Sequence, residues 1–158
     1  MILYVLIVIL IVIFDQLTKY WATIYLKPID TIGLINNVFH LTYVENKGAA
    51  FSLLQNQRWL FISVTIIIII VLSYMIITKK IKGYLSLICA SFIIGGGIGN
   101  LIDRIFNGFV VDFFDFRLIN FAVFNVADSF VFIGGVIWAV WYFFFCKKER
   151  KGNIDETN

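Results

Sequence analysis

The chain has 158 residues, of which 61% are hydrophobic and 18% aromatic, with a net charge of +3 and a mean hydropathy of +0.92. Soluble domains contain about 45–50% apolar residues, so the composition excludes an ordinary soluble domain and indicates an integral membrane protein of one domain, residues 1–158. Its Lys and Arg residues gather at 79–82 and 147–151, beside apolar runs. This pattern predicts contact with anionic membrane lipid and no nucleic-acid partner.

The first apolar run covers residues 2–26 and is long enough to cross the hydrocarbon core, about 30 Å thick. It lacks a basic leading region, so we expect an uncleaved anchor. Asp15 and Lys19 are four residues apart and therefore share a helix face. We interpret them as a pair that locks this helix against its neighbours, because a nearby ammonium would hold Asp15 ionised and unreactive. Direct participation in a site is the alternative.

Pro28 ends this helix, and residues 29–57 are polar enough to lie outside the bilayer core. Within them, residues 38–44 alternate as a strand does and 45–48 read as a turn. Residues 49–57 are predicted to form a short helix in the membrane interface.

Three further spans are expected at 59–77, 84–102 and 129–146, followed by a basic tail at 147–158. Glycines at 95, 96, 97 and 99 favour tight helix packing in the third span, and Asn100, Asp103 and Arg104 share a face near its end. Four spans put both termini on one side of the membrane, and the basic clusters assign that side to the cytoplasm. The segment between the last two spans then lies near the extracytoplasmic face.

That segment contains two runs that favour strands, 110–116 and 121–126. A hairpin with a four-residue loop would place Asp112 opposite Asn125. Asn125 has the pattern of a helix N-cap with Asp128 three residues later, a variant of the capping box. The sequence therefore predicts that Asp112 and Asp128 lie close together.

Two neighbouring carboxylates cannot both ionise cheaply, and such a pair performs acid–base catalysis in aspartic proteases. Asp128 is predicted to be the ionised member, because a helix N-terminus favours negative charge. The alternative reading is a cap residue at Asp128 and an interfacial strand residue at Asp112. His40 is the only histidine, which excludes a site that requires two, and Cys89 and Cys146 lack the spacing of a zinc site.

Four sequence blocks together resemble the lipoprotein signal peptidases, the type II signal peptidases of bacteria. They are residues 15–19 (DQLTK), 46–51 (NKGAAF), 95–104 (GGGIGNLIDR), and 111–113 with 124–129 (VDF and FNVADS). The resemblance implies four transmembrane helices with a small extracytoplasmic β-cradle and a short interfacial helix. It also implies an aspartic endopeptidase of the bacterial inner membrane, without metal or cofactor, that cuts prolipoproteins just before a diacylglyceryl-modified cysteine.

By motif position, the resemblance implies that Asp112 and Asp128 are the catalytic pair. Asn100, Arg104 and Asn125 would then line the site, Asn46 and Gly48 would contribute from the cradle, and Asp15, Lys19 and Asp103 would mainly support the fold. We expect a monomer, since the sequence marks no oligomer interface. Two other functions remain open from the residues: a small membrane carrier or proton conductor that uses the carboxylates, and a non-catalytic scaffold protein.

Overall fold

The computed structural model describes residues 1–48 and 54–146. In these ranges four helices are long and apolar enough to cross a membrane. The first is α1 (Ile2–Trp21), which a π-helical turn (Ala22–Leu26) extends. The others are α2 (Arg58–Ile77), α3 (Tyr84–Phe106) and α4 (Val126–Trp141), the last extended by a π-helical turn (Tyr142–Cys146). The prediction of four spanning helices is confirmed, although α3 runs four residues beyond the predicted end at 102 and α4 begins three residues before the predicted start at 129.

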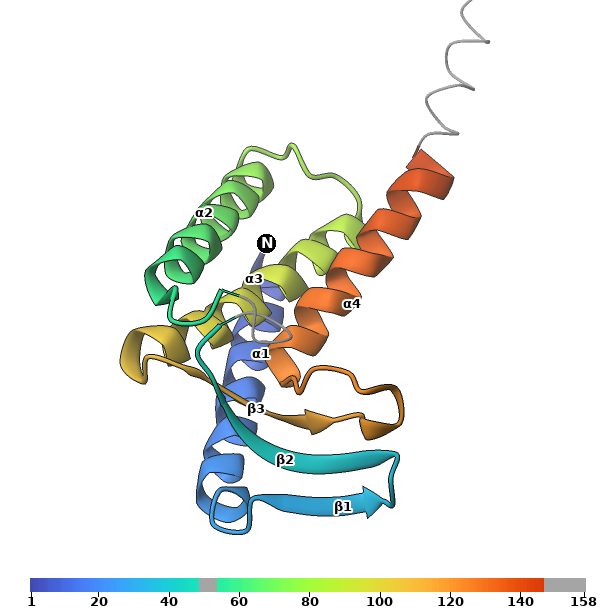
Figure 1. The fold of residues 1–158 in the computed structure, drawn as a ribbon. Coiled ribbons are helices and arrows are strands. Elements are labelled where there is room, and N and C mark those ends of the chain that lie inside the picture. The colour runs from blue at the N-terminus through green and yellow to red at the C-terminus, as the bar shows by residue number, and fades with distance from the viewer. Residues whose placement is uncertain (49–53, 147–158) are drawn as a thin grey trace, which may run out of the picture.

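Helix α3 is the centre of the bundle and packs against α1, α2 and α4. Its glycines explain why these contacts are close. A Cβ at Gly96 would meet the backbone oxygen of Ala127 and the side chain of Val131 on α4, and a Cβ at Gly99 would meet the carboxylate of Asp15 on α1. Gly96 thus allows α4 to begin directly against α3, as predicted. Helix α2 packs mainly against α3 and stands away from α4 (Figure 1).

A small antiparallel sheet lies beside the ends of α1, α3 and α4 (Figure 1). Its strands are β1 (Thr31–Ile35), β2 (Phe39–Asn46) and β3 (Val110–Asp115), in the order β1-β2-β3. Strand β2 matches the strand predicted at 38–44, whereas β1 was not predicted. The register places Asp112 opposite Val44, next to an irregularity between Leu41 and Val44.

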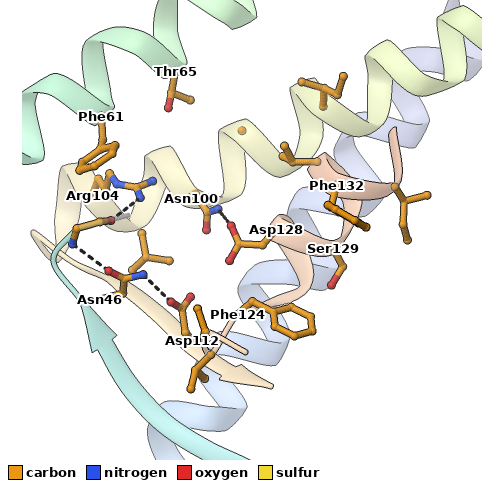
Figure 2. Close-up of a pocket in the computed structure, with 18 of the residues that line it drawn as sticks. Asn46, Phe61, Thr65, Asn100, Arg104, Asp112, Phe124, Asp128, Ser129 and Phe132 are labelled. Atoms are coloured by element: carbon orange, nitrogen blue, oxygen red, sulfur yellow. Dashed lines mark hydrogen bonds between the residues drawn. The ribbon is translucent and has the colours of Figure 1, made fainter. Parts of the chain in front are cut away.

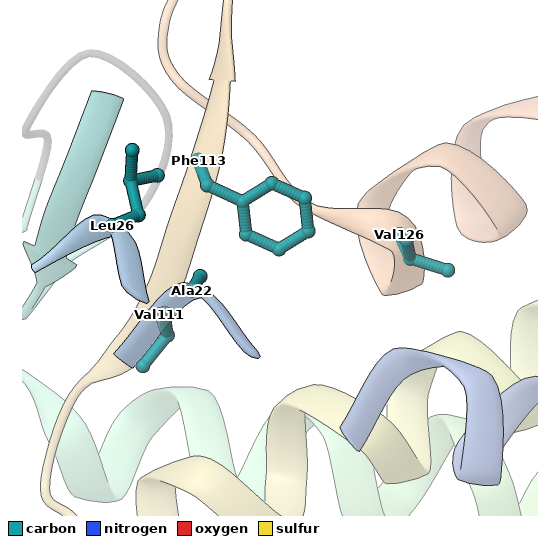
Figure 3. Close-up of a cluster of buried hydrophobic side chains, with 5 residues drawn as sticks. All are labelled: Ala22, Leu26, Val111, Phe113 and Val126. Carbon is teal, nitrogen blue, oxygen red and sulfur yellow. The ribbon is translucent and has the colours of Figure 1, made fainter. Parts of the chain in front are cut away.

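A cluster of buried apolar side chains joins this sheet to the helices (Figure 3). Val111 and Phe113 of β3 pack with Ala22 and Leu26, which follow α1, and with Val126 at the start of α4. Val111 and Phe113 flank Asp112 in the sequence, and because successive strand side chains point to opposite faces, Asp112 points away from this cluster. The apolar core therefore sets the direction in which Asp112 faces.

The hairpin predicted for 110–116 and 121–126 forms only in part, and its register differs from the prediction by one residue. Strand β3 pairs along its length with β2, while the second run meets β3 at the antiparallel Phe114–Phe124 bridge, and the Phe121 N–H donates to the Phe116 oxygen over 3.2 Å. Arg117–Ile119 form a 3-10 turn between the two runs. The physical reason is that β2 offers β3 a long free edge, whereas residues 121–125 have to leave the sheet to enter α4 at its N-cap. The interfacial helix predicted at 49–57 falls largely on residues outside the described ranges.

Candidate active site

Asp112 and Asp128 border the same cavity, of about 810 Å³ (Figure 2). Asp112 comes from the middle of β3 and is only 1% exposed. Asp128 lies in the first turn of α4. Most of the lining is apolar and comes from α2, α3, α4 and residues 116–124, whereas the polar lining includes Asn46, Asn100, Arg104, Asp112 and Asp128. The structure thus brings the two predicted carboxylates to one polar end of an apolar cavity.

Asn125 begins α4 with the capping box that the sequence predicts. Its backbone is extended, with φ −128° and ψ −173°. Its Oδ1 accepts a 2.9 Å hydrogen bond from the backbone N–H of Asp128, and its own N–H donates to Asp128 Oδ2 over 3.2 Å. These reciprocal bonds satisfy N–H groups that a helix start otherwise leaves free, and they hold the Asp128 carboxylate in place.

Each of the four carboxylate oxygens of the pair accepts an N–H. Asn125 Nδ2 donates to Asp112 Oδ1 over 2.6 Å, and Asn46 Nδ2 donates to Asp112 Oδ2 over 2.9 Å. On the other carboxylate, Asn100 Nδ2 donates to Asp128 Oδ1 over 2.7 Å, beside the backbone bond to Oδ2. Three asparagines from β2, α3 and the start of α4 therefore orient both carboxylates from three sides.

Burial, and next the negative charge of Asp128, raise the pKa of Asp112 to about 7. Hydrogen bonds from Asn46 and Asn125 and the charge of Lys19 act in the opposite sense but do not cancel these effects. A carboxyl group with a pKa near 7 exists in both protonation states at neutral pH, so it is suited to exchange a proton with a substrate.

Arg104 and Gly48 also line the cavity. Arg104 donates to the backbone oxygen of Gly48 over 3.4 Å, and its guanidinium lies 5.0 Å from the centre of the Phe61 ring on α2. Gly48 N–H in turn donates to Asn46 Oδ1 over 2.9 Å. Figure 2 shows this chain of contacts running from Arg104 to Asp112. The cavity therefore has a cationic group within its polar end.

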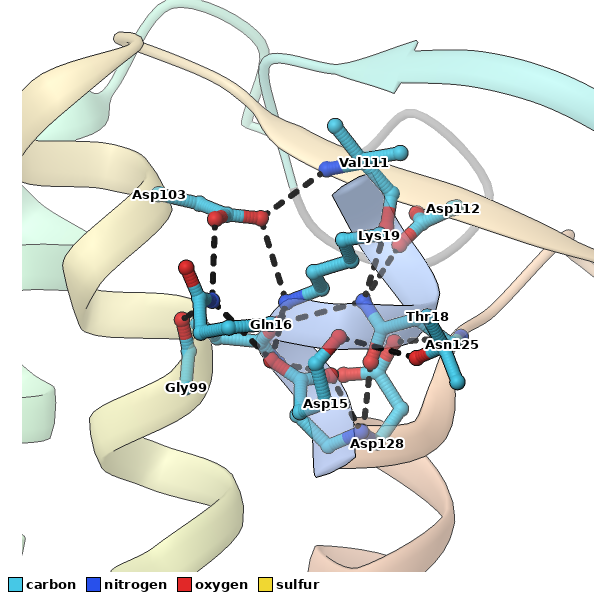
Figure 4. Close-up of polar contacts among 12 residues, drawn as sticks. Asp15, Gln16, Thr18, Lys19, Gly99, Asp103, Val111, Asp112, Asn125 and Asp128 are labelled. Carbon is cyan, nitrogen blue, oxygen red and sulfur yellow. Dashed lines mark hydrogen bonds and ion pairs between the residues drawn. The ribbon is translucent and has the colours of Figure 1, made fainter. Parts of the chain in front are cut away.

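A buried ionic cluster of Asp15, Lys19 and Asp103 lies next to the site (Figure 4). Lys19 Nζ lies 2.8 Å from Asp15 Oδ2, which confirms the predicted pair, and 3.1 Å from Asp103 Oδ2. Asp15 Oδ1 also accepts from the backbone N–H of Ala127 over 2.9 Å, and Asp103 Oδ2 accepts from that of Val111 over 3.2 Å. Because Ala127 precedes Asp128 and Val111 precedes Asp112, the cluster fixes the backbone beside both carboxylates.

The three polar residues at the end of α3 have separate contacts. Asn100 and Asp103 both reach Lys19, whereas Arg104 reaches Gly48. Gln16, to which the sequence reading assigned no role, donates to Asp15, Asp103 and the backbone oxygen of Gly99. The sequence could have indicated this role, because Gln16 lies beside Asp15 inside an apolar run and a polar residue in such a run needs a partner.

Asp115 is held apart from the pair. It accepts from Thr42 Oγ1 over 2.7 Å and from Arg117 Nε over 2.8 Å, and it pairs with His40 across the sheet. Burial alone would raise the pKa of Asp115, but the hydrogen bonds from Arg117 and Thr42 hold it below its ordinary value. A carboxylate held ionised by these partners is a structural group rather than a proton donor.

Four helices that can span a membrane, three of which line a cavity with two carboxylates at its polar end, define a membrane protein with a polar site beside its spanning helices. The family model described as signal peptidase (SPase) II matches residues 7–145, and the chain belongs to this family of membrane peptidases. It is 51% identical over 150 residues to a lipoprotein signal peptidase of Clostridioides difficile, covering 94% of this chain and 99% of that protein. A lipoprotein signal peptidase of Brevibacillus brevis is 44% identical over 147 residues, covering 93% and 99% of the two chains.

The fold is similar to that of solved bacterial membrane enzymes. One, determined by the in meso method at 2.3 Å resolution, superposes with a TM-score of 0.80 at 35% identity and covers 87% of this chain and 85% of its own. A second, determined at 1.9 Å resolution, gives a TM-score of 0.77 at 35% identity. The predicted family and fold class, a mainly helical membrane protein with a small sheet, are therefore confirmed.

Proposed function

We propose that this peptidase is an intramembrane aspartic endopeptidase that removes signal peptides from prolipoproteins. In this proposal it cuts just before a diacylglyceryl-modified cysteine, and Asp112 and Asp128 form the catalytic pair. The observation that carries the proposal is the shared cavity: both carboxylates border it, and burial together with the charge of Asp128 raises the pKa of Asp112 to about 7. Lipid-modified prolipoproteins and membrane lipid are the partners.

In the proposed reaction, ionised Asp128 takes a proton from a water molecule while the water oxygen bonds to the scissile carbonyl carbon. Protonated Asp112 gives its proton to the carbonyl oxygen, which yields a neutral tetrahedral intermediate. Asp128 then returns its proton to the leaving nitrogen as the C–N bond breaks, and Asp112 recovers its proton as the carboxyl product forms. The roles follow the surroundings: Asp128 receives two N–H bonds at a helix N-terminus, whereas Asp112 has the raised pKa.

The cavity walls suit an apolar substrate. Phe61 and Ile69 of α2 face one side of the cavity, and Val131 and Phe132 of α4 line another. A signal-peptide helix and acyl chains can bury apolar area between such walls. Arg104 and the nearby Asn46 and Gly48 would supply polar contacts to the substrate backbone or the lipid-modified cysteine.

We further propose that both termini lie in the cytoplasm of a bacterial cell and that the site lies near the extracytoplasmic face of the inner membrane. The basic cluster of Lys79, Lys80 and Lys82 follows α2 at the end that does not carry the site. A reporter enzyme that is active only outside the cytoplasm should be inactive when it is fused after Lys80. The same reporter inserted in the β1–β2 turn should be active. The reverse pattern would overturn this orientation.

The decisive test is cleavage of a lipid-modified prolipoprotein in detergent by the wild type and by Asp112→Asn and Asp128→Asn. Asp115→Asn is the matched control, because Asp115 lies on the same strand as Asp112 but bonds Thr42 and Arg117 instead. We expect both pair variants to fold and to lose at least about a thousandfold in rate, with the control close to wild type. A pair variant that cuts at the wild-type rate would remove that residue from the mechanism.

A further inference from the structure

We propose that Lys19 is a positioning residue for the carboxylate pair, which acts by fixing the side-chain amide of Asn100 that faces Asp128. The inference rests on the proposed catalytic role of Asp112 and Asp128. It assigns Lys19 a part in the reaction beyond the support of the fold that was expected for it.

The ammonium group of Lys19 is buried and has all its donors in use. Lys19 is 3% exposed. Its Nζ contacts Asp15 Oδ2 at 2.8 Å, Asp103 Oδ2 at 3.1 Å and Asn100 Oδ1 at 2.9 Å. An ammonium has three N–H donors and no acceptor, so these three contacts satisfy it completely. The third contact is to a neutral amide that touches the proposed catalytic pair.

That contact determines which end of the Asn100 amide faces the cavity. Because Lys19 can only donate, Asn100 has to turn its oxygen toward Lys19, and its Nδ2 then points to Asp128, where it donates to Oδ1 over 2.7 Å. A reversed amide would face Asp128 with an oxygen, and two acceptors cannot bond without a proton between them. Lys19 therefore keeps an N–H donor on the carboxylate that is proposed to act as the base.

A second branch reaches the other carboxylate. The oxygen of Asn100 also accepts from Asn125 Nδ2 over 3.1 Å, and the same Nδ2 group donates to Asp112 Oδ1 over 2.6 Å. The Asn100 oxygen thus receives donors from both Lys19 and Asn125. A single amide orientation, set by the ammonium, is compatible with the hydrogen bonds to both members of the pair.

The charged groups around Lys19 come from four elements. Asp15 lies on its own helix, Asp103 and Arg104 come from α3, Asp112 from β3 and Asp128 from α4. Loss of the ammonium would leave more negative charge beside the pair and would free the Asn100 amide to reverse. Burial and the charge of Asp128 raise the pKa of Asp112 and the charge of Lys19 opposes them, so loss of the ammonium would raise this pKa and extend the protonated range of Asp112 to higher pH.

The test compares Lys19→Met with Gln16→Met in the full chain. Methionine keeps most of the Lys19 stem without the ammonium. Gln16 belongs to the same cluster through hydrogen bonds to Asp15, Asp103 and Gly99, none of which involves Asn100 or either catalytic carboxylate. We would measure kcat and KM for a lipid-modified prolipoprotein, the pH profile of kcat, and the melting temperature in detergent.

We expect Lys19→Met to lower kcat about a hundredfold with KM nearly unchanged, the size of effect that a misplaced catalytic group produces, and to move the alkaline limb of the profile to higher pH. Gln16→Met should lower the melting temperature while kcat stays within about threefold of wild type. A Lys19→Met enzyme with reduced stability but a wild-type kcat and profile would show that Lys19 is only structural.

Asn100→Asp keeps the test informative if Lys19→Met does not fold, because it retains an oxygen for Lys19 and removes the N–H that Asp128 accepts. It should lose kcat as Lys19→Met does, and a wild-type kcat would overturn the proposal. Asp112→Asn and Asp128→Asn are measured alongside. If Asp112→Asn and Asp128→Asn are inactive while Lys19→Met and Asn100→Asp are fully active, the positioning role fails and the catalytic pair stands. If Asp112→Asn and Asp128→Asn are active, the catalytic proposal itself fails.

Discussion

Asn125 donates from Nδ2 to Asp112 Oδ1 over 2.6 Å, so the residue that begins α4 also holds the buried carboxylate of β3. The same side chain caps the helix through its oxygen, which accepts from the backbone N–H of Asp128. One fully buried residue thus joins the two carboxylates, because its side chain donates to Asp112 and its backbone N–H donates to Asp128 Oδ2.

Replacing Asn125 should therefore affect stability and catalysis together. Asn125→Ala removes the helix cap, which costs about 1 kcal/mol, and also removes a donor from Asp112, so hydrolysis should slow about a hundredfold. Asn107→Ala is the control, since Asn107 is an exposed asparagine at the end of α3. Thermal unfolding and prolipoprotein cleavage measure the two effects. A variant that is less stable but fully active would contradict the link between the cap and the pair.

The raised pKa of Asp112 predicts an activity that falls in alkaline solution. Burial, and next the charge of Asp128, raise this pKa to about 7, and the proposed mechanism needs Asp112 protonated. As the pH rises through about 7, Asp112 loses that proton and kcat should decline along the alkaline limb of its profile. Measuring kcat under saturating substrate across this range checks the prediction. A rate that stays constant to about pH 9 would exclude Asp112 as the acid.

The same pKa makes folding stability depend on pH. Because the folded pKa of Asp112 lies above the ordinary value of 3.8, the folded state binds more protons than the unfolded state between these values. The contribution of Asp112 is thus fully present below about pH 4 and is lost as the pH rises through about 7, at most about 4 kcal/mol. Asp112→Asn should show a flatter dependence of melting temperature on pH over this window. Equal slopes for the two proteins would contradict the raised pKa.

Gly96 should be intolerant of any side chain. A Cβ there would meet the backbone oxygen of Ala127 and the side chain of Val131, so Gly96→Ala should displace the start of α4 and cost about 1–3 kcal/mol. Activity should fall as well, since Asp128 lies in that turn. Gly135→Ala is the control, because no atom of residues 1–48 or 54–146 lies within 4 Å of a Cβ at that position. Equal melting temperatures for the two variants would show that α3 and α4 do not need this close approach.

The amino-acid sequence by itself determined the features that depend on neighbours along the chain. Apolar runs predicted the four spans, the spacing of Asp15 and Lys19 predicted their ion pair, and Asn125 with Asp128 predicted the capping box. Each is decided within one run or one turn of helix, so local pattern suffices. The glycines of α3 likewise indicated close packing, because the absence of a side chain has the same meaning whichever helix approaches.

Only the tertiary structure decided which partners the polar groups have. Asp112 meets Asn125 although the predicted hairpin forms only in part and in another register, because β3 pairs with β2 and the chain enters α4 directly after the Phe114–Phe124 bridge. Lys19 finds Asn100 and Asp103 on a helix more than eighty residues later in the chain. Strand pairing and buried ion contacts join distant segments, and their geometry depends on packing that a linear pattern does not contain.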